Sequence, residues 1–152
     1  MTIHQRSIPA SIDPEKLDRL AQAAVRVGLN LQPGQDLFLT APVAALPMVR
    51  KIAEHAYKAG AGLVTPILSD EEVTLARYRY ASDDSFDRAP GWLHEGVAKA
   101  FTNNTARLAI VGDDPMLLSE QDPAKVSRAS KANSIAYQPA LEKIAGFDIN
   151  WN

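Results

Sequence analysis

The amino-acid sequence predicts an α/β fold: a mostly parallel sheet flanked by helices in three layers, incomplete at the C-terminus. Short apolar runs typical of buried strands alternate along the chain with longer segments whose apolar residues recur at helical spacing. Such alternation indicates βαβ units with right-handed crossovers. With 152 residues, 46% hydrophobic and 22% charged, the chain is long and apolar enough for one domain with a real core.

The predicted elements follow one another in a Rossmann-like order. Residues 1–12 are polar and aperiodic and are expected to form a flexible arm, and residues 13–152 form the α/β domain. Asp13 and Pro14 provide a helix cap and a first-turn proline. The predicted helices lie around 14–27, 44–59, 73–80, 93–101 and from 123 to Pro139, and the predicted strands cover 36–41, 62–68, 106–111 and 148–151.

Three local signals refine this order. Pro66 lies inside a predicted strand and indicates an edge position or a bulge, because proline cannot donate to a sheet. The run Ser69-Asp70-Glu71-Glu72 predicts a capping box, in which the Ser69 hydroxyl and the Glu72 carboxylate satisfy free amides. Pro139 is expected to kink or end the last helix.

Charge and cysteine content exclude several classes of function. The net charge of −2, without a basic cluster, argues against nucleic-acid partners and against binding to an anionic membrane surface. The absence of cysteine excludes disulfides, zinc–thiolate sites and thiol nucleophiles. No apolar run has membrane-spanning length and no secretory signal begins the chain, so a cytoplasmic location is expected.

The histidines do not form a metal-binding pattern. His4 lies in the arm, His55 on the polar face of a helix between Lys51 and Lys58, and His94 in another helix. No His-x-x-x-His or His-x-Glu pair occurs, although such spacings would place ligands on one helix face. Solvated or capping roles are therefore favoured over metal ligation.

Acidic residues gather where two strands end. Asp70, Glu71 and Glu72 follow the second strand, and Asp113 and Asp114 follow the third. Ligands of open α/β sheets bind at the carboxyl ends of strands, and paired aspartates there could hold Mg²⁺. Acids in the first turn of a helix also cap free amides, and this capping role is the favoured interpretation.

Sequence motifs typical of cofactor binding or nucleophilic catalysis are either absent or in the wrong position relative to the predicted strands. Gly60-Ala61-Gly62 precedes a strand, whereas a dinucleotide fingerprint follows one. The order of acids does not fit a phosphoacceptor receiver domain, and no Walker or nucleophile-elbow motif occurs. Packing is expected for the aromatics Tyr57, Trp92, Phe101 and Trp151. No catalytic, cofactor-binding or metal residue is assigned.

The final residues show the period of a half-buried strand. Phe147, Ile149 and Trp151 alternate with polar residues, and no turn follows them. We expect a domain that stops in mid-strand to be part of a longer protein. Trp151 is then expected to be poorly sheltered or to rest on a neighbouring chain.

A series of short motifs, taken in order, resembles the N-terminal region of the aminopeptidase T family, which also includes aminopeptidase S. The resemblance extends from Leu17 to Trp151. Its motifs are Val25-Arg26-Val27-Gly28-Leu29-Asn30-Leu31-Gln32-Pro33-Gly34-Gln35, Ala41-Pro42, Ala56-Tyr57-Lys58-Ala59-Gly60-Ala61, Ser69-Asp70-Glu71-Glu72, Gly112-Asp113-Asp114-Pro115 and Ile149-Asn150-Trp151.

The resemblance implies a cytosolic, homodimeric exopeptidase that removes N-terminal amino acids from peptides. Such enzymes use two divalent metal ions (zinc, cobalt, manganese or magnesium), held by residues of a larger C-terminal part. No motif of that part is matched here, so no catalytic residue is transferred and this chain alone is expected to be inactive. A stand-alone binding or dimerisation module without catalysis is the alternative.

Overall fold

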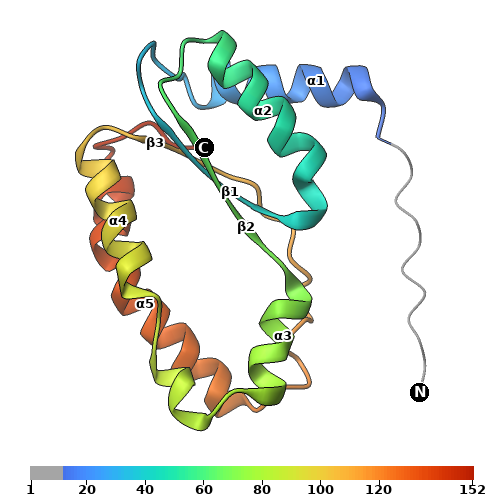
Figure 1. The fold of residues 1–152 in the computed structure, drawn as a ribbon, viewed down its shortest axis with the longest axis vertical. Coiled ribbons are helices and arrows are strands. Elements are labelled where there is room, and N and C mark those ends of the chain that lie inside the picture. The colour runs from blue at the N-terminus through green and yellow to red at the C-terminus, as the bar shows by residue number, and fades with distance from the viewer. Residues whose placement is uncertain (1–11) are drawn as a thin grey trace.

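The computed structural model describes residues 12–152, so the arm predicted for 1–12 lies outside the described residues except for Ile12. Strands β1 (Leu37–Pro42), β2 (Val64–Ser69) and β3 (Ala106–Ala109) form one parallel sheet in the order β2-β1-β3 (Figure 1). The parallel sheet predicted from the alternation of strands and helices is confirmed.

The helices occupy the segments between the strands, as the apolar spacing predicts. They are α1 (Pro14–Ala23), α2 (Leu46–Lys58), α3 (Glu71–Tyr80), α4 (Gly91–Thr102) and α5 (Pro123–Ala145). Shorter turns are the π-helical η1 (Ala24–Gly28) and the 3-10 segments η2 (Val43–Ala45) and η3 (Asp83–Asp87). Asp13 and Asp122 cap α1 and α5 by accepting hydrogen bonds from first-turn amides, and a proline follows each cap.

The first core cluster lies between the sheet and the pair α1–α2. Leu37, Leu39 and Ala41 alternate along β1 and are all buried on this face. Val25 from η1 and Ile52 from α2 pack on them in the same cluster. Side chains from η1 and from α2 therefore hold the central strand on this face.

A second core cluster lies on the opposite face of the sheet. Phe38 points to this side, and its ring meets that of Phe101 from α4 edge-on, with centroids 6.1 Å apart. Ala140 and Ile144 from α5 and Ile149 complete the cluster. Since helices cover both faces of the sheet, the predicted three-layer arrangement is observed (Figure 1).

Strand β2 lies at one edge of the sheet, as Pro66 predicts. Leu37 N–H donates to the carbonyl of Leu63, so residues 64, 66 and 68 turn their backbone groups away from β1. The Val64 amide on this outer side donates to Tyr57 Oη at 3.1 Å, and Pro66 has no amide hydrogen.

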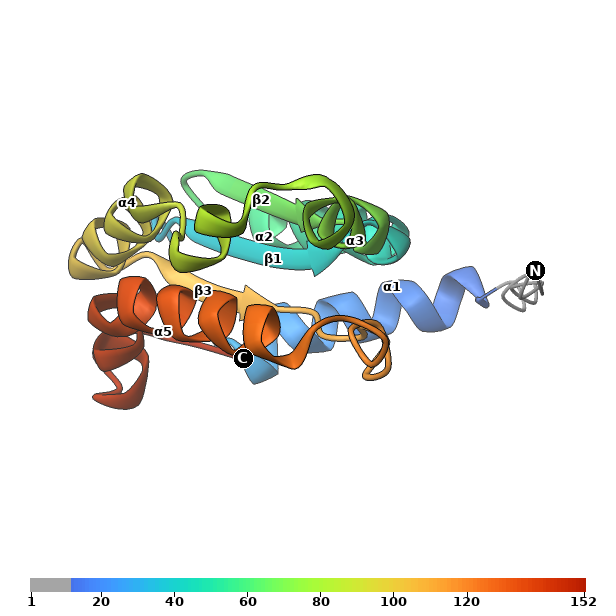
Figure 2. The same ribbon diagram turned by 90° about the horizontal axis from the view of Figure 1, so that it is seen from below.

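Helix α5 continues through Pro139 to Ala145. Figure 2 shows its last, dark red turns bent away from the line of the earlier ones. The kink predicted at this proline is therefore present, while an end of the helix at Pro139 is not.

The segment after α5 pairs with β3, but as an isolated parallel bridge between Arg107 and Trp151. Asn150 and Asn152 exchange backbone hydrogen bonds with Arg107 and Ala109. The Asn150 side chain also donates to the Asn30 carbonyl at 2.8 Å. The predicted strand 148–151 is thus reduced to this bridge, and Trp151 remains 43% exposed, in agreement with its expected poor shelter.

A third packed region lies at the far end of the molecule from the sheet (Figure 1). We call it the distal lobe: residues 77–91 together with the first turns of α5, residues 123–128. Phe86 of η3 is fully buried here and belongs to neither core cluster. The guanidinium carbon of Arg77 and the Lys125 Nζ lie 5.5 and 5.2 Å from the centroid of its ring.

Candidate functional site

The acidic residues predicted at two strand ends do meet in the structure. A pocket of about 470 Å³ at the carboxyl edge of the sheet is lined from both sides. Its acidic lining residues are Asp70, Glu71, Asp113 and Asp114. The backbone amide of Asp114 donates to Glu71 Oε1 at 2.9 Å, which joins the segments that follow β2 and β3.

Most of these carboxylates have structural roles. Asp70 Oδ1 accepts from the Val73 amide at 3.0 Å and caps α3, and Asp114 Oδ1 accepts from the Met116 amide at 2.8 Å. Glu72 lies 3.9 Å from Arg79. The favoured capping interpretation is confirmed for Asp70, whereas Asp114 holds a turn at residues 115–120 and no helix begins there.

The capping box predicted from Ser69 and Glu72 is wrong. Asp70 keeps extended dihedrals and α3 begins one residue later, so the cap is Asp70. The Ser69 hydroxyl instead points back to the sheet and donates to the Ala41 carbonyl at 3.5 Å. Either Ser69 or Asp70 can cap, and the position at which β2 ends selects the aspartate.

His55 is buried rather than solvated, which corrects the prediction for this residue. It is 5% exposed, and its Nε2 lies 3.1 Å from Asp18 Oδ1 of α1. Lys51 Nζ approaches the same oxygen at 3.2 Å. Helix α1 packs against α2 beside His55, and hydrogen bonds from His55 and then Lys51 hold the pKa of Asp18 below its usual value.

His94 joins two helices. Its Nε2 lies 3.0 Å from Asn133 Oδ1 of α5, and its ring meets Tyr137 edge-on with centroids 5.5 Å apart. His4 lies outside the described residues. Within residues 12–152 no group of three His, Asp or Glu side chains could hold a metal ion.

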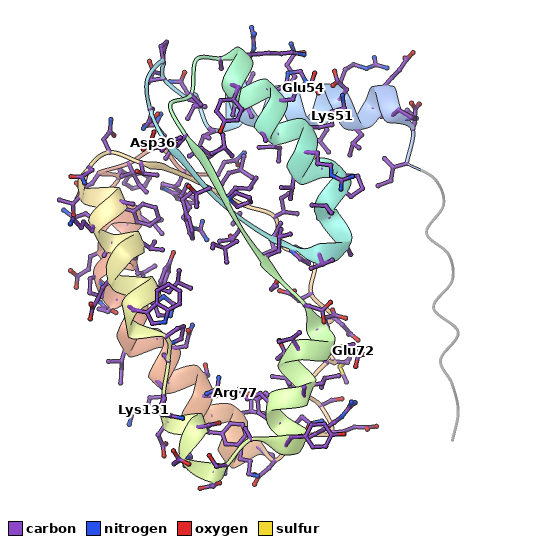
Figure 3. The ribbon with its side chains drawn as sticks, viewed as in Figure 1. Asp36, Lys51, Glu54, Glu72, Arg77 and Lys131 are labelled. Atoms are coloured by element: carbon purple, nitrogen blue, oxygen red, sulfur yellow. The ribbon has the colours of Figure 1, made fainter. Side chains whose placement is uncertain are left out.

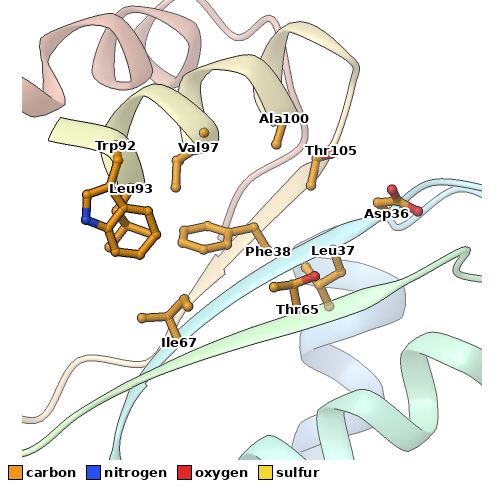
Figure 4. A pocket seen from close by; sticks show the side chains of 11 residues that line it. Asp36, Leu37, Phe38, Thr65, Ile67, Trp92, Leu93, Val97, Ala100 and Thr105 are labelled. Atoms are coloured by element: carbon orange, nitrogen blue, oxygen red, sulfur yellow. The ribbon is translucent and has the colours of Figure 1, made fainter. Parts of the chain in front are cut away.

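An apolar groove lies between α4 and the face of β1 and β2 (Figure 4). It encloses about 290 Å³, with Phe38 and Ile67 on the sheet side and Trp92, Leu93 and Val97 on the helix side. Phe101 packs in the core as predicted, but Trp92 is 77% exposed at one end of the groove. The packing expected for Trp92 is therefore wrong, because α4 covers only part of this sheet face.

The sequence profile of the thermophilic metalloprotease (M29) family matches residues 13–152. The chain belongs to this family. The resemblance inferred from the ordered motifs is thereby confirmed.

Members of this metalloprotease family with similar sequences carry aminopeptidase names. Aminopeptidase T of Thermus thermophilus is 50% identical over 135 residues, which cover 89% of this chain and 33% of that protein. Aminopeptidase T of Thermus aquaticus is 46% identical, over 90% of this chain and 34% of that protein. Aminopeptidase AmpS of Bacillus subtilis is 32% identical, over 90% of this chain and 33% of that protein. The chain spans about a third of the length of these relatives.

A solved structure shares the fold. Wild-type AmpT from Thermus thermophilus superposes with a TM-score of 0.88 at 48% identity, over 91% of this chain and 35% of that chain. The α/β arrangement described above is therefore that of the corresponding part of a metalloprotease relative. No helix among residues 12–152 has the length and apolar character that crossing a membrane requires.

The structure also contains a polar cluster that the sequence did not indicate. Arg128 of α5 donates to both carboxylate oxygens of Asp87 and to the side chain and carbonyl of Asp83. These hydrogen bonds lower the pKa of Asp87. Because 41 and 45 residues separate the partners, neither helical spacing nor a local motif indicates the pairing.

Proposed function

We propose that residues 13–152 form the N-terminal, non-catalytic domain of a metal-dependent aminopeptidase that removes N-terminal amino acids from peptides. The observation that carries this proposal is that the chain matches the metalloprotease family almost throughout, yet spans about a third of relatives named aminopeptidases. The domain would act as scaffold and as one wall of the substrate cavity.

The described residues do not fit a metal centre, so no catalytic step is assigned to them. Of the acids at the carboxyl edge, Asp70 caps α3, Asp114 accepts from the Met116 amide in a turn, and Glu71 binds the Asp114 amide. His55 and His94 are engaged with Asp18 and Asn133. The two divalent ions of the intact enzyme (zinc, cobalt, manganese or magnesium) would bind to residues beyond this set.

Two further parts of the proposal rest on the family resemblance. The intact enzyme would act in the cytoplasm and as a homodimer. Sedimentation equilibrium of the intact enzyme tests the second part, where a single species of monomer mass would contradict it. Cell fractionation followed by immunoblotting tests the first, where recovery with the membrane or secreted fraction would contradict it.

A hybrid enzyme tests the central proposal. Residues 13–152 replace the matched segment of Thermus thermophilus aminopeptidase T, to which this chain is 50% identical over 135 residues. The hybrid is expected to hydrolyse leucyl-p-nitroanilide in a metal-dependent way. This chain alone, with Co²⁺ or Zn²⁺ added, is expected to show no turnover.

Two controls make the result decisive. The relative without its matched segment shows whether that segment is needed, and circular dichroism shows whether the hybrid is folded. A folded hybrid without activity would contradict the role of this domain. Metal-dependent turnover by the 152-residue chain alone would contradict its non-catalytic character.

A further inference from the structure

A cationic pocket lies at the junction of the distal lobe and α4. It encloses about 400 Å³ and lies next to the apolar groove of Figure 4, because the Trp92 ring borders both. Its lining residues are Arg77, Ser85, Arg88, Ala89, Pro90 and Trp92. Two guanidinium groups and no carboxylate among its lining residues favour an anionic ligand.

Arg77 is held in a fixed orientation. Its Nη2 donates to the carbonyls of Ser85 and Arg88, and its guanidinium carbon lies 5.5 Å from the centroid of the buried Phe86 ring. It extends from α3 toward the side of α5 (Figure 3). Within residues 12–152 no carboxylate forms an ion pair with Arg77, and its Nε and Nη1 donors remain for a ligand.

The acids of η3 leave this pocket positive. Arg128 engages Asp83 and Asp87 through direct hydrogen bonds. Asp84 lies 3.9 Å from Arg88, and both side chains are 72% exposed, so this ion pair is loose and easily displaced. Arg88 is therefore available as a second donor beside Arg77.

The start of α4 adds to the pocket's preference for an anion. Helix α4 begins at Gly91 without a side-chain cap, and its positive dipole end lies at Pro90 and Trp92 of the pocket wall. The Gly91 and Leu93 amides donate to the carbonyls of Ala89 and Pro90, so the contribution of α4 is that of its dipole. The apolar Ala89, Pro90 and Trp92 surfaces are suited to a hydrocarbon group attached to the anion.

We propose that this pocket binds the C-terminal carboxylate of a peptide whose last residue is apolar. The carboxylate would lie between the guanidinium groups of Arg77 and Arg88, which suit its planar, bidentate geometry. The adjoining side chain would pack on Trp92 at the mouth of the apolar groove. The choice of a peptide as ligand rests on the proposed aminopeptidase function, while the preference for a carboxylate rests on the pocket itself.

Tryptophan fluorescence provides a direct test on the 152-residue chain. Trp92 and Trp151 are the two tryptophans, so a Trp151→Phe background leaves Trp92 as the reporter. The probes are N-acetyl-alanyl-leucine and its C-terminal amide, titrated at constant ionic strength. A saturable change in Trp92 emission is expected, with the acid binding about tenfold more tightly than the amide.

Variants assign the binding to the two arginines. Arg88→Gln is expected to weaken binding of the acid about five- to tenfold, and Arg77→Lys, which keeps the charge but loses the planar fork, by a similar factor. Arg79→Gln on the same helix removes the same charge outside the pocket and is expected to change affinity less than about twofold. Circular dichroism confirms that each variant is folded.

Several outcomes would overturn the proposal. They are equal binding of acid and amide, equal effects of Arg88→Gln and Arg79→Gln, no saturable signal, or displacement by inorganic phosphate as effective as by the peptide acid. None of these depends on catalysis. A hybrid enzyme that fails while the acid still binds would refute the proposed function alone, and an active hybrid without binding would refute this inference alone.

Discussion

Phe86 should control the stability of the distal lobe without controlling that of the sheet. Its side chain is fully buried, yet it belongs to neither core cluster. Around it lie Arg77, Lys125 and Tyr78, whose ring centroid is 5.2 Å away. We therefore expect Phe86→Ala to loosen residues 77–91 and the first turns of α5 before the rest of the molecule.

The expected magnitude follows from the buried area. A phenylalanine side chain buries roughly 150–250 Å². At about 25 cal/mol per Å² this corresponds to about 4–6 kcal/mol, an upper value because unfolded chains are partly collapsed. Large-to-small substitutions of phenylalanine in cores destabilise by about 3–5 kcal/mol. Phe86→Ala should therefore lower the local free energy of opening by about 4 kcal/mol.

Hydrogen exchange with mass spectrometry resolves this effect by segment. Peptides from η3 and the N-terminal turns of α4 and α5 should lose most of their protection, while peptides from β1 keep theirs. Leu39→Ala, at a fully buried position of the central strand, is the control and should reduce protection throughout. Equal loss of protection in β1 and η3 after Phe86→Ala would refute an independent distal lobe.

Three other perturbations have defined outcomes. The pKa of Asp87 is lowered by Arg128, so the contribution of this carboxylate to stability is present above pH ~4 and is lost as the pH falls through the folded-state pKa. In urea unfolding, the free energy of unfolding should therefore fall less between neutral and acid pH for Asp87→Asn than for the wild type. Gly60 has φ +92° and lies against Pro33, so Gly60→Ala should destabilise by at least about 1 kcal/mol in thermal unfolding. Phe147 has φ 56° and is 79% exposed, so Phe147→Gly should melt higher than Phe147→Ala, and the reverse order would contradict left-handed strain there.

Local signals in the sequence predicted the elements and their order. Pro66 correctly indicated an edge strand because its missing amide hydrogen is a property of the residue itself. Pro139 correctly indicated a kink, and Asp13 correctly marked the start of a helix. Each of these inferences depends on a few neighbouring residues.

The errors arise where distant segments decide the environment. His55 lies on the charged face of α2, and only the docking of α1, which brings Asp18 to it, buries the ring. Trp92 occupies a core spacing in α4, but no element covers that part of the sheet in residues 12–152. The Arg77–Arg88 pocket likewise requires η3 to fold back on α3, a contact that periodicity does not reveal.

The outer side of β2 bears on how this molecule behaves at high concentration. A strand from another molecule could pair with residues 64–68 only if β2 offered it alternating backbone hydrogen-bond donors and acceptors. It would find carbonyl oxygens, but the Val64 amide is occupied by Tyr57 and Pro66 has no hydrogen to offer, so the Leu68 amide is the one outward donor left in β2. Although Ile67 and Leu68 are exposed, this edge resists the stacking that leads to amyloid, and replacing Tyr57 and Pro66 together would remove that protection.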